Sequence, residues 1–576
     1  MLNNTRRISA TLCAIALAAC AAQAPPGGTA DESIVVTGSR NRDGPPPPAP
    51  PPPPPPPPVA EMRAYAPMVG AVAAPYAQTA PQPMPGDIDT EQYEDVDANP
   101  IHIVAEDPVS TFSVDVDTAS YANTRRFLNE GRLPPRDAVR IEELINYFHY
   151  DYPLPPTREQ PFSTNVTVAP SPWAEGRQLV HIGLQGYNIV PRERPPLNLV
   201  LLLDVSGSMN APNKLPLLQQ SFRLLIDQLN ERDRVAIVVY AGAAGTVLEP
   251  TPGNERGRIL AALDSLRPGG STAGAEGLRQ AYALAEQNFD RNSVNRVIIG
   301  TDGDFNVGIA DPEQLQDFVE RKRETGIYLS VFGFGEGNYN DALMQRLAQN
   351  GNGVATYIDT LNEARRVLRD EMASNMFTIA NDVKIQVEFN PSRVAEYRLI
   401  GYETRMLRRE DFNNDQVDAG EIGSGHSVTA IYEITPVGGP TFTEPLRYQP
   451  QQQAQSTAGE LAFLRIRYKL PGEEDSRLIE RPITQGDVVA SMARAPESTR
   501  WAAAVAGYGQ LLRGDPYLRQ GFGWNDVIAL AQGARGSDEF GWRAEFVRLA
   551  QTASSAAALP AAQNGGAPEP RPRASR

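Results

Sequence analysis

The sequence predicts an α/β protein with a central, doubly wound, mostly parallel β-sheet. Between residues 197 and 373, apolar segments of strand length alternate with amphipathic segments of helix length. This alternation is typical of a parallel sheet that carries helices on both faces. Strand-rich stretches occur on either side of the region, and a helical stretch follows near the C-terminus. We therefore expect a central α/β domain between two flanking modules.

Periodicity gives the elements of the central domain, residues 197–373. Strands are expected at short apolar runs rich in Val, Ile and Leu, namely 199–203, 234–240, 294–300, 327–332 and 355–358. Helices are expected where apolar residues recur every three or four positions, namely 215–229, 255–266, 273–288, 312–323, 341–348 and 361–373. Strands and helices thus follow each other in regular succession.

The N-terminal flank, residues 99–196, is expected to be an α+β module. Phe112, Val114 and Val116 alternate as in a strand, and the apolar residues of 141–148 have helical spacing. Further strands are expected at 162–168 and 179–184, just before the central domain.

The C-terminal flank, residues 374–555, is expected to begin as strands and end as helices. Alternation at 383–389 and 462–468 is typical of an antiparallel, sandwich-like module. Helical periodicity follows from 499 to 552. Residues 556–576 have the composition of a disordered tail.

Charge and cysteine content exclude several classes of function. The 576-residue chain has a formal net charge of −16 without a basic patch, so nucleic acid is not an expected partner. The only cysteines are Cys13 and Cys20. The folded body therefore has neither a disulfide nor a cysteine-based zinc site. The four histidines share no spacing with a Ser or Cys nucleophile, and we expect no catalytic residues.

Residues 1–19 have the features of a signal peptide. Arg6 and Arg7 precede an apolar run that is too short to span a bilayer. The run ends in Leu-Ala-Ala-Cys at residues 17–20, which resembles the lipobox of bacterial lipoproteins. The resemblance implies that Cys20 is lipidated, and the absence of Asp after it implies sorting to the outer membrane. An ordinary signal peptide cleaved after Ala19 or Ala22 is the alternative.

Residues 20–98 are expected to form a disordered, proline-rich tether. Nearly pure proline runs at 45–48 and 50–58 favour polyproline II, a semi-rigid spacer. Within the tether, Ile34, Val35 and Val36 lie in a segment that resembles the energy-coupling box of outer-membrane receptors. That resemblance implies contact with a coupling protein by strand addition, whereas the alternative is an exposed β-prone stretch without a partner.

The strongest chemical signal follows the first central strand. Asp204, Ser206 and Ser208 occupy alternate positions of a turn at the carboxyl end of a parallel strand, where open α/β sheets bind ligands. Three side-chain oxygens can converge there. Hard cations such as Mg²⁺ and Ca²⁺ bind oxygen ligands of this type, so the spacing indicates a divalent-cation site.

This Asp-x-Ser-x-Ser resembles the first signature of the metal-ion-dependent adhesion site of von Willebrand A domains, which have a Rossmann-like fold. Thr272 and Asp302 lie in the later loops where that family completes its ligand shell, either directly or through water. The resemblance implies a single cation, with Mg²⁺ preferred and Mn²⁺ or Ca²⁺ as alternatives. It also implies an open coordination position that accepts an Asp or Glu carboxylate of a protein partner.

The flanks resemble those of the YfbK-like group of bacterial von Willebrand A lipoproteins. The phrase from Thr111 to Tyr121, the Leu-Pro-Pro at 133–135 and the helix at 140–148 carry this resemblance, and residues 375–552 resemble the C-terminal module of the group. We therefore expect a lipid-anchored cell-envelope protein that binds a partner through its cation site. A metal-independent envelope scaffold is the first alternative, and a metallohydrolase is the second.

Overall fold

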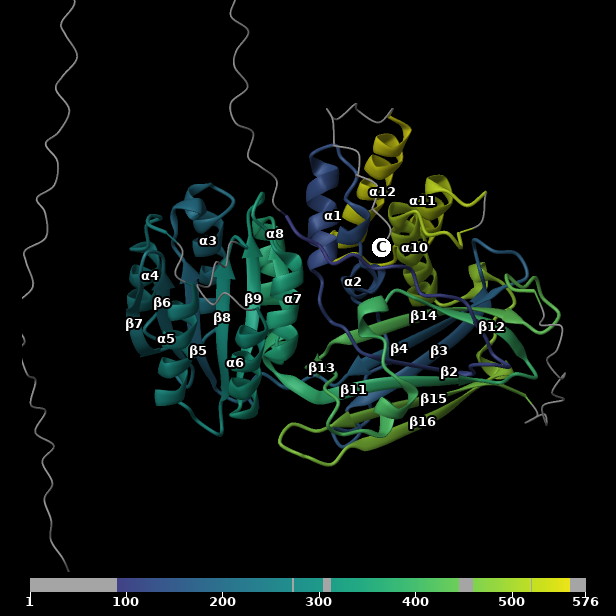
Figure 1. Ribbon diagram of the computed structural model, residues 1–576, viewed down its shortest axis with the longest axis horizontal. Coiled ribbons are helices and arrows are strands. Elements are labelled where there is room, and N and C mark those ends of the chain that lie inside the picture. Colours follow the sequence, from purple (N-terminus) through teal and green to yellow (C-terminus); the bar gives the residue numbers. More distant parts are fainter. Residues whose placement is uncertain (1–90, 272–273, 304–311, 445–458, 519–520, 560–576) are drawn as a thin grey trace, which may run out of the picture. The chain divides into compact units, whose positions relative to one another are not determined.

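The computed structural model of the protein describes residues 91–271, 274–303, 312–444, 459–518 and 521–559 (Figure 1). Several predicted features lie outside these residues: the signal peptide, the lipidation site Cys20, nearly all of the tether with Ile34 to Val36, and the predicted cation ligand Thr272. Most of the predicted tail also lies outside, although the last helix extends to Ala558.

The predicted central sheet is confirmed, with six strands. Across the sheet they are β10 (Ala355–Ile358), β9 (Ile327–Phe334), β8 (Val294–Thr301), β5 (Leu197–Asp204), β6 (Arg234–Tyr240) and β7 (Ala244–Pro252). All neighbours are parallel except β6 and β7. Strand β7 was not predicted, and it contains Pro250 and Pro252, which disfavour the interior of a sheet. At the edge of a sheet, prolines are tolerated since one row of backbone groups has no strand partner.

Helices cover both faces of this sheet (Figure 1). On one face lie α3 (Leu215–Ile226), α4 (Arg256–Asp264) and α8 (Leu361–Arg365). On the other lie α5 (Gly274–Gln287), α6 (Pro312–Glu324) and α7 (Asp341–Asn350). Successive residues of a strand point to opposite faces, so Leu201 and Leu203 enter one core and Leu202 enters the other. This double burial explains why the strands are continuously apolar.

The helix predicted at 361–373 is wrong as a single element. It consists of α8, a π-helical turn at Arg366–Asp370 and α9 (Met372–Met376). The break surrounds Arg366, which is buried and pairs with Glu363 at 3.0 Å and Glu371 at 3.1 Å. Arg366 begins the π-helical turn, and its two ion pairs reach back to Glu363 in α8 and forward to Glu371 just after the turn. The spacing of apolar residues carries no sign of these contacts, so it did not predict the break.

The flanking strands form two facing sheets. One sheet has the order β1 (His102–Ile103), β12 (Val394–Ile400), β14 (Ser427–Pro436), β4 (Gln178–Gly186) and β3 (Phe162–Pro170). In the other, β11 (Thr378–Phe389) pairs on one side with β2 (Val109–Ser113) and β13 (Gly420–Gly423), and on the other side with β15 (Glu460–Lys469), followed by β16 (Arg477–Thr484). Strand β2 ends at Ser113, so the predicted alternation to Val116 runs past the strand.

Strands from both flanks share these sheets. In antiparallel pairs, β4 lies beside β14, β2 beside β11 and β1 beside β12. Apolar side chains of both flanks fill the core between the sheets. The stretches that we treated as separate N- and C-terminal modules therefore complete each other, and the chain passes through the central domain between them.

A helical layer covers the outer face of the sheet that contains β14. It consists of α1 (Ala119–Asn129), α2 (Ile141–Asn146), α10 (Glu497–Arg513), α11 (Trp524–Gly533) and α12 (Trp542–Ala558). Trp501 of α10 is fully buried at its centre and meets Phe148 and Phe546 edge-on. Short 3₁₀ turns complete the structure at Arg136–Ala138, Gly207–Asn210, Glu403–Arg405, Arg409–Asn413, Gln485–Asp487 and Met492–Arg494.

Buried ion pairs join the central domain to the flanking unit. Arg125 of α1 bonds to Asp359 and Glu363 of the central domain and to Glu545 of α12. The carboxylate of Asp117 accepts a 2.8 Å hydrogen bond from the backbone N–H of Ala355, at the start of the edge strand β10. The edge of the central sheet is thereby covered by the flanking unit, which protects it from pairing with other chains.

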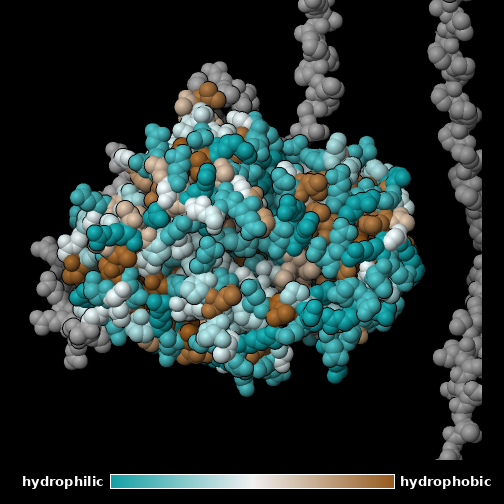
Figure 2. All heavy atoms as spheres, turned by 180° about the vertical axis from the view of Figure 1, so that it is seen from behind, coloured by the Kyte–Doolittle hydropathy of each residue, from teal (hydrophilic) through white to brown (hydrophobic). Residues whose placement is uncertain are grey.

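The surface of the described part is mostly polar. On the face drawn in Figure 2, hydrophobic residues occur in small, separate groups among hydrophilic ones. None of the helices within the described ranges is both long and apolar enough to cross a bilayer.

One buried carboxyl group of the flanking unit makes stability depend on pH. Glu142 of α2 is fully buried, and burial, with repulsion from Glu403, Asp115 and Glu143, raises its pKa to about 8. The fold therefore favours the neutral acid. Its contribution is complete below the unfolded-state pKa near 4.5 and is lost as pH rises through 8.

We expect Glu142→Gln, which stays neutral, to be more stable than the wild type by about 1 to 3 kcal/mol at pH 8.5 and little changed at pH 4.5. Thermal unfolding at both pH values measures the difference. The exposed Glu410→Gln is the matched control. A stabilisation of Glu142→Gln that is the same at both pH values would contradict this account.

Candidate functional site

The parallel pairing of β5 with β8 places the two predicted aspartates side by side. In the register of this pair, Leu203 lies opposite Gly300, so Asp204 at the end of β5 adjoins Thr301 at the end of β8. The Thr301 hydroxyl donates a 3.2 Å hydrogen bond to Oδ2 of Asp204. Asp302 follows directly. Both aspartates are fully buried at the carboxyl edge of the sheet.

The turn after β5 brings the two serines to Asp204. Oδ1 of Asp204 accepts a 2.8 Å hydrogen bond from the backbone N–H of Ser206, and the hydroxyls of Ser206 and Ser208 are 3.0 Å apart. Ser206 is buried, Ser208 is half-buried, and the neighbouring Gly207 and Asn210 are exposed. The turn thus presents oxygen atoms inward while its outer side opens to solvent.

A glycine fixes the turn after Asp302. Gly303 has a φ of +98°, a conformation that L side chains rarely adopt. A Cβ at this position would lie 2.5 Å from the carbonyl oxygen of Asn338. Close contact with the loop after β9 therefore requires glycine next to the aspartate.

The loop that precedes Thr272 is tied to the turn after β5. The backbone N–H of Gly207 donates to the carbonyl of Gly270 at 3.1 Å, and the N–H of Gly269 donates to the carbonyl of Val205 at 2.8 Å. Four of the five predicted ligands, namely Asp204, Ser206, Ser208 and Asp302, therefore meet at one place, and the loop that carries the fifth adjoins them.

Burial of Asp204 and Asp302 makes their charged forms costly in free energy. It raises the pKa of Asp204 to about 6, and the charge of Asp302 raises that pKa further, while hydrogen bonds from Ser206 and Tyr240 oppose the shift. Two buried carboxyl groups that repel each other are stabilised by a nearby positive charge.

The structure supplies one such charge that the sequence analysis missed. The ammonium of Lys214 lies 2.9 Å from Oδ2 of Asp302, and its side chain is almost completely buried. The stem of Lys214 packs on Gly335, where a Cβ would lie 2.3 Å from Lys214 Cγ. A lysine in a loop before a helix gives no sequence signal of this kind, because the contact depends on a glycine about 120 residues away.

The donor set fits a hard divalent cation. It offers two buried carboxylates and two hydroxyls, all of them oxygen ligands, and one edge faces solvent. No group of three or more His, Cys, Asp or Glu side chains that could hold a metal ion occurs in the described ranges, and this site, with its two carboxylates and two hydroxyls, is not such a group either. That these residues bind a cation remains a prediction.

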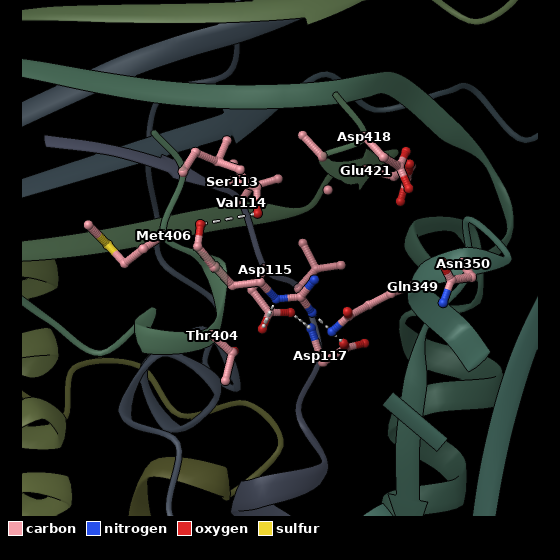
Figure 3. Close-up of a pocket in the computed structure, with 16 residues that line it drawn as sticks. Ser113, Val114, Asp115, Asp117, Gln349, Asn350, Thr404, Met406, Asp418 and Glu421 are labelled. Carbon is pink, nitrogen blue, oxygen red and sulfur yellow. Dashed lines mark hydrogen bonds and ion pairs between the residues drawn. The ribbon is translucent and has the colours of Figure 1, made fainter. Parts of the chain in front are cut away.

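A cavity of about 210 Å³ lies at the joint between the central domain and the flanking unit (Figure 3). Arg405 occupies its wall and bonds to Asp115 and Asp117 at 3.0 Å each. Asp418 and Glu421 line the same space. Because Asp115 and Asp117 come from the N-terminal flank and Arg405 from the C-terminal flank, these bonds hold the two flanks of the flanking unit together.

The sheet order, the helices on both faces and the Asp-x-Ser-x-Ser turn define a von Willebrand factor type A protein. The family description "von Willebrand factor type A domain" matches residues 198–370, "von Willebrand factor" matches 87–181, and "Uncharacterized protein YfbK, C-terminal" matches 374–556. The uncharacterized protein YfbK of Escherichia coli is 46% identical over 473 residues, which are 81% of each chain. The chain therefore belongs to the YfbK family.

More distant likenesses cover less of the chain. Inter-alpha-trypsin inhibitor heavy chain H3 of Mesocricetus auratus is 26% identical over 273 residues, which are 43% of this chain and 29% of that one. Among solved structures, a von Willebrand factor type A protein from Catenulispora acidiphila is 15% identical with a TM-score of 0.39 and covers 70% of this chain and 90% of that one.

The Lys214 contact generates a prediction for the cation-free protein. In Lys214→Met, Asp302 loses the buried ammonium, so the variant should unfold more easily in EDTA, by about 2 to 4 kcal/mol. Added Mg²⁺ should then stabilise the variant more than the wild type, because the cation no longer competes with the lysine. Thermal unfolding with EDTA and with Mg²⁺ measures both effects.

Lys322→Met is the matched control, because Lys322 forms a more exposed ion pair with Glu286 in the same domain. It should change neither quantity by more than a few tenths of a kcal/mol. A Lys214→Met variant that gains no more from Mg²⁺ than the wild type does would contradict the assignment of Lys214 as a competitor.

Proposed function

We propose that this protein is a lipid-anchored cell-envelope protein that binds a protein partner through a divalent cation held by Asp204, Ser206, Ser208, Thr272 and Asp302. The meeting of two buried carboxylates and two serine hydroxyls at a solvent-facing edge of the sheet carries this proposal. Mg²⁺ is the preferred ion, with Mn²⁺ or Ca²⁺ as alternatives. The protein acts by binding and not by catalysis.

The residues favour recognition of a carboxylate. With only two carboxylates in its shell, a bound divalent cation would retain positive character and an open position for an oxygen ligand. Asp or Glu of a partner supplies such a ligand. The relatives of this domain, which include an inter-alpha-trypsin inhibitor heavy chain, support an adhesion-type function.

The anchoring part of the proposal comes from the sequence alone. Cys20 ends an apolar run of the signal-peptide type, and a proline-rich stretch separates it from the folded body. In this arrangement the lipid holds the chain at the envelope, and the proline runs keep the binding site away from the membrane surface.

A metal-independent scaffold is the second candidate function. The Lys214–Asp302 contact favours it, because this ammonium supplies part of the positive charge that the carboxylates require. In a scaffold the flanking unit would make the partner contacts, and chelation would leave them unchanged.

Partner capture separates the two functions. The full chain, immobilised through its C-terminus, is exposed to solubilised envelope proteins of its own organism in Mg²⁺ or in EDTA, and retained proteins are identified by mass spectrometry. We expect one set of proteins to be retained only in Mg²⁺ and to be lost with Asp204→Ala or Asp302→Ala. Binding of the identified partner should fall at least about tenfold when its contacting Asp or Glu is replaced by Asn or Gln.

The exposed Asp264→Ala, on α4 of the same domain, is the matched control and should retain the same set. Retention that is equal in EDTA and in Mg²⁺ would reject the cation-dependent function and favour the scaffold.

A further inference from the structure

A groove lies between α8 of the central domain and the start of α12 in the flanking unit. Its volume is about 480 Å³, within the range of small-molecule binding sites. It shares no residue with the constellation around Asp204. Any ligand of this groove would therefore be bound independently of the cation.

An aromatic pair forms one wall of the groove. The ring of Phe540 stacks on Trp542 with centroids 4.7 Å apart and planes at 23°. Phe540 is 44% exposed, although a phenylalanine of a folded domain is more often buried. Trp542 is fixed from behind by Tyr147 and His149. The structure thus holds a rigid apolar platform at the surface.

The platform belongs to two adjoining cavities. A second cavity of about 130 Å³ shares Glu539, Phe540 and Trp542 with the groove. The aromatic pair therefore forms a wall that both cavities share. Two cavities with a common aromatic wall give room for more than one unit of a chain-like ligand.

The polar lining of the groove is electrically balanced. It has three guanidiniums and three carboxylates, whereas the whole chain carries a net charge of −16. The guanidiniums are bonded to carboxylates: Arg125 and Arg548 to Glu545 at 3.2 and 3.5 Å, and Arg365 to Asp370 at 3.4 Å. The carboxylate of Glu539 is in none of these pairs. An anionic ligand would have to displace a carboxylate from a guanidinium, and the equal numbers of opposite charges give the lining no net attraction for either sign, so the lining favours a ligand without charge.

We propose that this groove binds an uncharged oligosaccharide, with a sugar ring packed on the exposed ring of Phe540, which Trp542 supports from its other side. The C–H face of a pyranose ring is weakly apolar and packs on an aromatic plane. Its hydroxyls need planar donors and acceptors, which Asn362, Arg365 and Glu539 provide at the rim. In a cell envelope, such a ligand would attach the body to a glycan while the cation site holds a protein partner.

Titration with soluble sugars tests the proposal. Chitotetraose, cellotetraose and maltotetraose are titrated into the full chain, and binding is followed by tryptophan fluorescence and by saturation-transfer NMR. We expect at least one of the three to bind, with Phe540→Ser weakening its affinity about tenfold. Binding should be the same in EDTA and in Mg²⁺, which separates this site from the cation site.

Phe289→Ser is the matched control, because Phe289 has a similar exposure of 39% but lies outside the groove. It should bind the sugar as the wild type does, and an unchanged melting temperature in both variants shows that the fold is retained. Ordinary small-molecule sites have dissociation constants well below about 10 mM, so they would be saturated at that concentration. If none of the three sugars binds at about 10 mM, the proposal is overturned. An equal loss of sugar affinity in Phe540→Ser and Phe289→Ser would also overturn it. A proline hexamer is titrated as a fourth, uncharged ligand, and binding of this peptide without binding of any sugar would overturn the proposal as well.

Discussion

The parallel pairing of β5 with β8 is the constraint on which the candidate site depends. Because parallel strands end at the same edge of the sheet, the register that sets Leu203 against Gly300 leaves Asp204 beside Thr301 and Asp302. The carboxylates could not both be buried there without hydrogen-bond donors or a positive charge. Ser206, Thr301 and Lys214 provide these in the described structure. The apolar strands thus hold the two carboxylates in a buried position, although burial of charged groups costs free energy.

A second consequence of the fold is the joint between the central domain and the flanking unit. The chain leaves the flanking unit to form the central domain and then returns to it. Strand pairs such as β4 with β14 join the segment before the central domain to the segment after it. Buried charges such as Arg125 and Arg366 then bind across the joint. A buried ion pair adds little net stability, but its loss is costly, so these contacts favour one relative arrangement of the two units. The oligosaccharide groove lies along this joint and depends on that arrangement.

Much of the central domain could be predicted from the sequence, because each strand is continuously apolar and each helix has one apolar face. Strands β6 and β10 have the predicted bounds. The edge strand β7 could not be predicted, since its prolines are permitted only by its edge position. The shared sheets of the flanks were also not foreseen, because the pairing of β4 with β14 joins residues about 250 positions apart and no local pattern encodes it. The contact of Lys214 with Asp302 could not be predicted for the same reason, because the two residues are far apart in the sequence. The spacing of Asp204, Ser206 and Ser208 is local and could be recognised.

The central claim is that one divalent cation is bound by Asp204, Ser206, Ser208, Thr272 and Asp302. Crystals of the folded body grown with Mn²⁺ test it most directly, through anomalous diffraction at the manganese absorption edge. The account predicts a single strong peak within about 2.5 Å of side-chain oxygens of these residues, with the Lys214 ammonium displaced from Asp302. No peak at this edge of the sheet, with Lys214 still bonded to Asp302 in the presence of the ion, would contradict it.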